Sequence, residues 1–203
     1  VSSENVEPSP VLASSYEVSD DGLTTTVHLR PAACFSDGSP LTAQDAAYSL
    51  ISSRGTVYYG SRLRHVTSIA ASDEKTLVLT TDTAYECLPL LLDIPIIKDG
   101  SRDEAVPLGS GPYVMDGDTR LVRNTNWWQT AAPIVDFAEV KLTLVEKTSE
   151  VRDNFEYENV NLVLTDPNSA AFAGFHNDYE LWDARLPIMQ YIGYNITSKV
   201  FSN

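Results

Sequence analysis

The stretch CFSDGSPLTAQDAAYSL, residues 34–50, places two carboxylates and several small polar residues directly before an apolar run. Asp37 and Gly38 form a turn signal. Thr42 stands where a helix N-cap is expected, and Asp45, three residues later, supplies the acidic partner of a capping box. We therefore interpret both carboxylates as structural. An acid–base pair would need a pocket and a partner base, and nothing nearby supplies them.

Helical periodicity begins inside this stretch. Small and apolar residues recur at i, i+3, i+4, i+7 and i+8 and predict one buried helix face, made of Ala43, Ala46, Ala47, Leu50 and Ile51. The segment AYECLPLLL, residues 84–92, predicts a short apolar helix with Pro89 in its first turn. The segment EKTSEVRDNFEYE, residues 146–158, predicts a solvated helix.

Several other segments have the pattern of β-strands. Residues 16–30 predict a hairpin, because Asp21-Gly22 is a turn signal between two β-prone runs. In residues 135–146, apolar side chains alternate with polar ones, as in a half-buried strand. Further strands are expected at residues 75–81, 119–124, 160–165 and 189–195. Mostly antiparallel strands with helices between them predict an α/β domain of mixed α+β character.

Composition and charge exclude several classes of protein. The chain has 203 residues, a hydrophobic content of 43% and a net charge of −14. A negative field repels phosphate backbones, so we expect no nucleic-acid partner. The longest apolar run, residues 88–97, is interrupted by two prolines and an aspartate and is too short to span a bilayer. Residues 1–10 lack a hydrophobic signal, so we expect either a cytosolic chain or a mature exported one.

The cysteines and histidines indicate no metal site. Cys34 and Cys87 are the only cysteines, and the three histidines show no ligand spacing. We therefore expect no metal and no cofactor. At this point a disulfide bond and two buried thiols both remain open.

Four segments in the same order resemble one protein family. Residues 16–50, YEVSDDGLTTTVHLRPAACFSDGSPLTAQDAAYSL, resemble the signature region of the family 5 extracellular solute-binding proteins of ABC transporters. Similar motifs are VPLGSGPYVM, RLVRNTNWWQ and MQYIGYNIT, which begin at residues 106, 120 and 189. The departures from the family pattern are Tyr16 for Trp, Ala32, Ala33 and Cys34 for a Gly-Val-Lys-like run, Ser110 for Thr and Thr125 for Pro. The family includes dipeptide-, oligopeptide- and nickel-binding proteins.

The resemblance implies a fold and a division into lobes. Members resemble two α/β lobes of the type II periplasmic-binding fold that close on a ligand by a hinge motion. Members are more than twice as long as this chain. We therefore expect residues 1–203 to form the N-terminal lobe alone, without its first strand and its C-terminal return segment.

The resemblance also implies a function. Members bind and deliver a small solute, an oligopeptide among others, to an ABC transporter permease, and they do not catalyse a reaction. We accordingly expect a monomer at the extracellular face of a bacterial membrane or in the periplasm, with a lipid anchor as one option. The acidic residue that grips a peptide's amino group lies beyond this chain in the family, so the identity of the solute stays open.

Two regions match cleft-lining positions of the family. Peptide-binding members present a tyrosine after the first helix, which makes Tyr58 or Tyr59 a ligand-binding candidate. Tyr191, Gly193 and Asn195 are candidates near the hinge, where a glycine lets a ligand backbone come close. The alternatives are ordinary surface or core tyrosines and a plain core strand.

Two other functions are alternatives to solute binding. A secreted hydrolase would need a nucleophile and a base; Gly109-Ser110-Gly111 lacks the full elbow motif and is interpreted as a tight turn. A sensor domain reusing the binding fold remains an alternative. Trp127-Trp128 is interpreted as structural. If the strand before Cys34 and the strand before Cys87 are neighbours, their ends can meet, and an exported protein permits oxidation, so a Cys34–Cys87 disulfide is our hypothesis.

Overall fold

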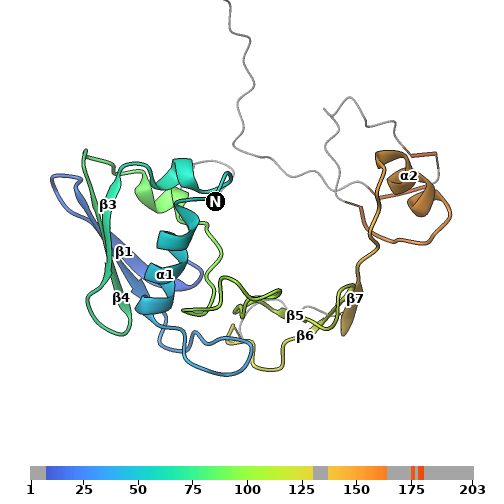
Figure 1. Cartoon of the computed structure of the whole chain (residues 1–203), viewed down its shortest axis with the longest axis horizontal. Coiled ribbons are helices and arrows are strands. Elements are labelled where there is room, and N and C mark those ends of the chain that lie inside the picture. Colours follow the sequence, from blue (N-terminus) through green and yellow to red (C-terminus); the bar gives the residue numbers. More distant parts are fainter. Residues whose placement is uncertain (1–7, 130–136, 164–174, 177, 181–203) are drawn as a thin grey trace, which may run out of the picture.

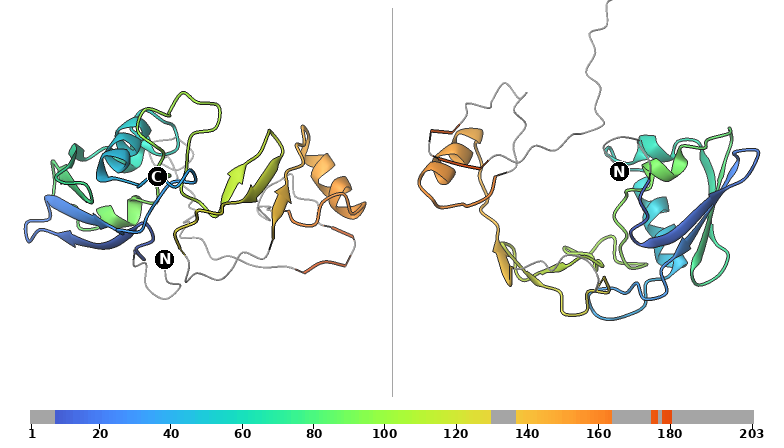
Figure 2. Two further views of the ribbon diagram at one scale, coloured as in Figure 1. Left: turned by 90° about the horizontal axis from the view of Figure 1, so that it is seen from below. Right: turned by 180° about the vertical axis from the view of Figure 1, so that it is seen from behind.

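The computed structural model describes residues 8–129, 137–163, 175–176 and 178–180. Two antiparallel sheets follow one another along the chain, with order β1-β2-β4-β3 in the first and β5-β6-β7 in the second. Helix α1 packs against the first sheet. Helix α2 comes last and lies well away from that sheet, beyond β7 (Figure 1). The views from below and from behind show the same separation (Figure 2).

The predicted hairpin is present. Strands β1 (Ala13–Val18) and β2 (Thr24–Leu29) pair antiparallel. Gly22 closes the turn between them with a φ of +68°, and its N–H donates to the carbonyl of Ser19 at 2.8 Å. A positive φ is tolerated by glycine because it has no Cβ. A Cβ at this position would also lie 3.0 Å from the Cβ of Ala84. Both the backbone conformation and the close neighbour therefore favour glycine here.

Strand β4 occupies the centre of the first sheet beside β2. It covers Thr76–Thr81, as the sequence predicted, and its other neighbour is β3, Val66–Ala71. Residues along β2 and β4 alternate between half-buried and buried, which confirms a two-faced sheet. Strand β3 was not predicted from the sequence. A register shift between Val66 and Ser68 interrupts its alternation, which hides the pattern of a strand.

Helix α1 spans Ala43–Ser53 and packs against β3 and β4. The predicted capping box is present, with Thr42 as N-cap and Asp45 as its acidic partner. Four of the five residues predicted to face the core are buried, but Ile51 is 51% exposed. At 3.6 residues per turn Ile51 lies about 80° around the helix from Ala43, which places it at the edge of the buried stripe.

One hydrophobic core lies between α1 and the first sheet. Phe35, Leu41 and Leu79 are completely buried there, and the 3-10 turns η1 (Gly60–Leu63) and η2 (Leu88–Leu91) contribute Leu63 and Leu88. The helix predicted over residues 84–92 is shorter in the structure, where only the four residues of η2 are helical. Pro89 does lie in its first turn, as expected, and the geometry is that of a 3-10 helix.

The second sheet is smaller and less buried. It comprises β5 (Tyr113–Met115), β6 (Arg120–Arg123) and β7 (Glu139–Lys141). The strand predicted over residues 135–146 is longer than the observed β7. Pairing with β6 ends at Lys141, and Leu144 beyond it is 89% exposed.

The last described segments also differ in part from the expectation. Helix α2 spans Thr148–Glu156, inside the predicted range. Residues 160–163 form no strand, and the rest of that predicted strand lies outside the described residues, as does the one at 189–195. The fold class itself, a mixed α/β chain with antiparallel strands and flanking helices, is confirmed.

Candidate functional site

The C-terminal half of α1 carries a row of hydroxyl side chains that faces a later segment of the chain. The Ser49 hydroxyl oxygen lies 2.9 Å from the backbone N of Ile97 and 3.0 Å from its carbonyl oxygen. Further along, the Tyr48 hydroxyl accepts a hydrogen bond from the backbone N–H of Arg102 at 3.2 Å. These contacts fix the segment from Pro95 to Arg102 against the helix.

Between the helix end and this segment lies a shallow hollow of about 200 Å³. It is lined by serine and threonine residues, one tyrosine, one arginine, one proline and one isoleucine. They are Ser49, Ser52, Ser53, Thr56, Tyr59, Pro95, Ile97 and Arg102. Small-molecule sites commonly combine apolar walls with a few placed polar groups, so this hollow is the candidate binding site of the described part of the chain.

The structure separates the two tyrosine candidates. Tyr59 lines the hollow and packs partly against the core. The Arg62 guanidinium lies over the Tyr59 ring at 5.2 Å from its centroid and forms an ion pair with Asp93. Tyr58 is 84% exposed and is not among the residues that line the hollow. The other predicted ligand residues, Tyr191, Gly193 and Asn195, lie outside the described residues.

The two carboxylates of the opening stretch are held by local hydrogen bonds. Asp45 is buried and accepts from the backbone N–H of Thr42 at 2.8 Å and from that of Asp99 at 2.9 Å. Asp37 accepts from the Ser39 hydroxyl at 2.6 Å and backbone at 2.8 Å and pairs with Lys98 at 3.1 Å. The Ser39 hydrogen bonds, with Lys98 adding to them, lower the pKa of Asp37 to about 2. Both groups act structurally, as the sequence predicted.

Cys34 and Cys87 are free cysteines in the structure, so the expected disulfide is not present in it. The reason lies in strand direction. Because β2 and β4 are antiparallel, with Thr24 opposite Thr80 and His28 opposite Thr76, the chain leaves them at opposite ends of the sheet. Cys34 follows β2, where its thiol donates to the carbonyl of Asn126 at 3.2 Å, and Cys87 follows β4 at the other end.

The tryptophan pair and the glycine-rich turn also have structural surroundings. Trp128 packs against the core, and its Nε1–H is buried without an acceptor among the described residues. The carbonyl of Gly109 accepts from the backbone N–H of Ser36 at 2.9 Å, and β5 begins shortly afterwards at Tyr113. Both observations agree with the structural interpretation of these motifs.

Arg102 was not predicted as a site residue from the sequence. Arg102 is distant in sequence from α1, and only the contact of its backbone with Tyr48 shows that the two belong together. Within the described residues, no group of three or more His, Cys, Asp or Glu side chains is arranged to hold a metal ion. Of the helices that the structure describes, none has the length and apolarity needed to cross a membrane.

Comparisons with known proteins agree on one family. A model of the bacterial extracellular solute-binding proteins, family 5 Middle, matches residues 7–203. The glutathione-binding protein GsiB of Escherichia coli O1:K1 is 26% identical over 211 residues, which cover 95% of this chain and 41% of the relative.

Solved structures of similar proteins share the fold. The structure of a nickel ABC transporter from Bacillus halodurans matches with a TM-score of 0.62 and 26% identity, over 74% of this chain and 32% of that one. The PBP AgaA from A. tumefaciens R10, solved in complex with agropinic acid, also matches with a TM-score of 0.62 and 26% identity, over 75% of this chain and 34% of that one. The chain thus spans less than half the length of these relatives. Since the family model covers nearly all of it, the chain belongs to the bacterial extracellular solute-binding proteins of family 5.

Proposed function

We propose that this chain is part of a receptor that captures a small solute outside the cytoplasmic membrane and delivers it to an ABC importer. The observation that carries the proposal is the family match over residues 7–203. It is supported by the relatives, which include a glutathione-binding protein and a nickel ABC transporter. An oligopeptide is one class of solute that such a receptor would take.

The proposal assigns residues 1–203 to the N-terminal lobe of a two-lobed receptor. The length of the relatives supports this, because the chain spans 41% of the glutathione-binding protein. In the whole protein a second lobe would close over the first and bury the solute between them. The receptor would be a monomer that contacts a permease in the membrane. It would be either free in the periplasm or held by a lipid anchor at the extracellular face of the membrane.

Within this lobe, Tyr59 is the proposed contact with the solute. A phenol offers flat apolar area and one hydroxyl with few rotatable bonds, which suits recognition of a small molecule. Tyr59 combines this chemistry with a place at the hollow, whereas Tyr58 lines no part of it. Tyr191, Gly193 and Asn195 remain proposed contacts from the hinge-proximal segment.

Mass spectrometry of the full-length protein tests the proposal. The protein is purified from its own cells without dialysis, denatured, and its small-molecule fraction is compared with that of a Tyr59→Ala variant prepared in the same way. A receptor is expected to release one class of solute in a near-stoichiometric amount, and the variant less of it. If the fraction contains no enriched solute, or if the protein converts that solute into a product, the proposal is wrong.

A further inference from the structure

The sequence contains Asp-Gly steps at residues 21–22, 37–38, 99–100 and 116–117. Such a step can modify itself. The backbone nitrogen of the glycine attacks the side-chain carboxyl carbon of the aspartate, and water leaves as a cyclic succinimide forms. Water then opens the ring at either carbonyl, which restores aspartate or gives isoaspartate, in which the main chain runs through the former side chain. The reaction needs no reactant other than water.

The fold decides which of these steps can react. The attacking glycine N–H must have no hydrogen-bond acceptor, and the aspartate carboxyl group must be able to turn toward it. The carboxyl group must also be protonated, because its hydroxyl then leaves as water. Finally, the space beside the glycine must be open to the ring. The steps differ in how many of these conditions they meet.

The glycine N–H groups of the first two steps are engaged. The N–H of Gly22 donates to the carbonyl of Ser19 at 2.8 Å, and the N–H of Gly38 donates to the carbonyl of Phe35 at 2.9 Å. Breaking one such hydrogen bond before the attack slows the reaction about fivefold. Neither glycine is therefore ready to act as the nucleophile.

The carboxyl groups of the same two steps are also held. The Ser19 hydroxyl donates to Asp21 at 2.6 Å, and the Ser39 hydroxyl donates to Asp37 at 2.6 Å. These hydrogen bonds lower the pKa of both carboxyl groups, that of Asp37 to about 2. Less of the reactive acid form is therefore present at neutral pH, which slows both steps further.

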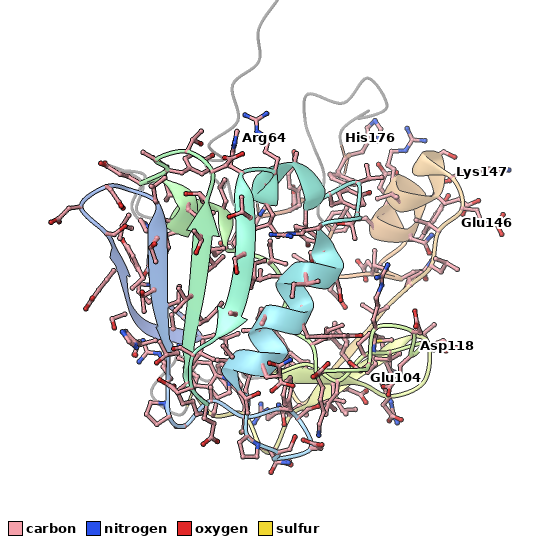
Figure 3. All side chains as sticks on the ribbon, turned by 60° about the vertical axis from the view of Figure 1, so that its left-hand side comes forward. Arg64, Glu104, Asp118, Glu146, Lys147 and His176 are labelled. Carbon is pink, nitrogen blue, oxygen red and sulfur yellow. The ribbon has the colours of Figure 1, made fainter. Side chains whose placement is uncertain are left out.

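The step at residues 116–117 meets the conditions only in part. Asp118, the residue after it, lies at the turn of the β5–β6 hairpin (Figure 3). In the described chain the N–H of Gly117 has no acceptor, but the Asp116 carboxylate forms an ion pair with the Arg120 guanidinium. The N–H of Asp116 also donates to the carbonyl of Arg120 at 2.8 Å. The carboxyl group is thus turned away from the nucleophile by its partner.

The step at Asp99 and Gly100 meets the geometric conditions. The N–H of Ser101 donates to the carbonyl of Lys98 at 3.0 Å, so Asp99 and Gly100 are the central residues of an exposed turn. Among the residues that the structure describes, the Asp99 carboxyl group, the Asp99 carbonyl and the Gly100 N–H have no hydrogen-bond or ion-pair partner. The peptide between the two residues can therefore rotate toward the carboxyl group.

The space beside Gly100 is also open. Gly100 has a φ of +83°, and a Cβ added to it would meet no atom within 4 Å. At Gly22, by contrast, an added Cβ would lie 3.0 Å from the Cβ of Ala84. A succinimide ring can therefore form at Gly100 without displacing a neighbouring residue.

This turn lies between two contacts that fix one wall of the hollow. The backbone of Ile97 before it is fastened to α1, and the N–H of Arg102 after it donates to the Tyr48 hydroxyl at 3.2 Å. The N–H of Asp99 itself donates to the Asp45 carboxylate at 2.9 Å. Isoaspartate adds a methylene group to the main chain between these fixed ends. The turn, or one of the contacts beside it, is then lost.

We propose that Asp99-Gly100 is a site of spontaneous modification, at which Asp99 becomes isoaspartate and the wall of the hollow loosens. In the first step a bond forms between the Gly100 nitrogen and the Asp99 Cγ, and the carboxyl hydroxyl leaves with the N–H proton as water. In the second step water adds to the backbone carbonyl carbon of Asp99, and the bond from that carbon to the Gly100 nitrogen breaks. The inference does not depend on which solute the protein binds.

The test incubates the full-length protein at neutral pH and analyses its peptides by mass spectrometry at intervals. Electron-transfer fragments distinguish isoaspartate from aspartate, and a peptide lighter by one water reports the succinimide. Isoaspartate is expected to form at Asp99 about fivefold faster or more than at Asp21 or Asp37. In urea the four steps should react at similar rates, because each has glycine as its nucleophile. A preference for Asp99 that is equally large in urea would overturn the proposal, since the fold would not be its cause.

Two variants serve as controls. Asp99→Glu keeps the charge and the backbone N–H but would have to form a larger ring, so modification at this position should disappear. Arg120→Gln releases the Asp116 carboxylate and should increase modification at Asp116 alone. If Asp99 stays unmodified in the wild type, or if Asp21 or Asp37 reacts as fast, the proposal is overturned.

Hydrogen exchange measures the loosening of the wall. In protein modified at Asp99, at least one amide between Asp99 and Arg102 is expected to exchange about fivefold faster, because its hydrogen bond is lost. Asp99→Glu incubated for the same time should exchange like fresh protein. Isoaspartate at Asp99 with unchanged exchange across this segment would overturn the proposed effect on the hollow.

Discussion

The carboxylate of Asp45 accepts a hydrogen bond from the backbone N–H of Asp99 at 2.9 Å, across 54 residues of sequence. The same carboxylate accepts from the backbone N–H of Thr42 at 2.8 Å and so completes the capping box of α1. One side chain thus begins the helix and holds the segment that forms the opposite wall of the hollow. The cap that the sequence indicates is therefore also a support of the candidate site.

Replacing Asp45 by Ala is expected to lower the free energy of unfolding by about 2–4 kcal/mol, because a cap contributes about 1 kcal/mol and the part-buried N–H of Asp99, left without its acceptor, costs about 1–3 kcal/mol. Urea denaturation measures the change. Asp20→Ala, in the exposed hairpin turn, is the control and should stay within about 0.5 kcal/mol of the wild type. Equal stability of both variants would show that Asp45 supports neither the helix nor the segment.

Asp37 makes stability depend on pH in the acid range. Hydrogen bonds from Ser39, with Lys98 adding to them, lower its pKa from the ordinary value of 3.8 to about 2 in the folded chain. A depressed folded pKa stabilises the protein above the unfolded pKa, and this contribution is lost as pH falls from about 4 toward 2. The difference in unfolding free energy between wild type and Asp37→Asn should be constant above about pH 5 and shrink below pH 4.

Urea denaturation of both proteins between pH 2 and pH 6 checks this, at low and at high salt. Because Asp37 and Lys98 are both exposed by about two-fifths of their side chains, salt should reduce the Lys98 contribution and leave that of Ser39. A difference that does not change with pH would contradict the assignment.

The two neighbouring tyrosines should respond differently to truncation. Tyr59→Ala removes a ring that packs partly against the core, and we expect a loss of about 1–3 kcal/mol in unfolding free energy. Tyr58→Ala removes a side chain that is 84% exposed, and we expect a change within about 0.5 kcal/mol. Thermal or urea denaturation of the two variants measures these losses. A larger loss of stability in Tyr58→Ala than in Tyr59→Ala would contradict the packing of Tyr59 against the core.

The parts of the fold that the sequence predicts are those with local causes. The hairpin is indicated by Asp21-Gly22, and the start of α1 by Thr42 and Asp45, because turns and caps depend on residues next to each other. Strand β3 was missed because its register shifts between Val66 and Ser68. The strand predicted at residues 135–146 was too long, because the alternation of apolar and polar residues does not show where a partner strand ends.

The candidate site was predicted only in part, for a related reason. The family resemblance made Tyr58 and Tyr59 candidates, but which of the two lines the hollow depends on how the chain turns into η1. Arg102 was missed because its place depends on the distant contact with Tyr48. The expected Cys34–Cys87 contact depended on strand direction, which only the register of β2 and β4 reveals.

Both cysteines of the native protein should react as free thiols. Cys87 is exposed, whereas Cys34 is half-buried and donates to the carbonyl of Asn126, so Cys87 is expected to react first. Intact mass after timed alkylation without reductant should show one adduct quickly and a second more slowly. A mass that gains adducts only after reduction would demonstrate a disulfide and contradict the structure.

The most direct test of the receptor is calorimetry of the solute that co-purifies with the full-length protein, titrated into that protein and into residues 1–203 alone. A solute enclosed between two lobes loses half of its contacts when one lobe is absent. The full-length protein is predicted to bind one equivalent of solute saturably, and residues 1–203 to show no measurable heat. Equal affinity of the two, or no binding by the full-length protein, would contradict the account.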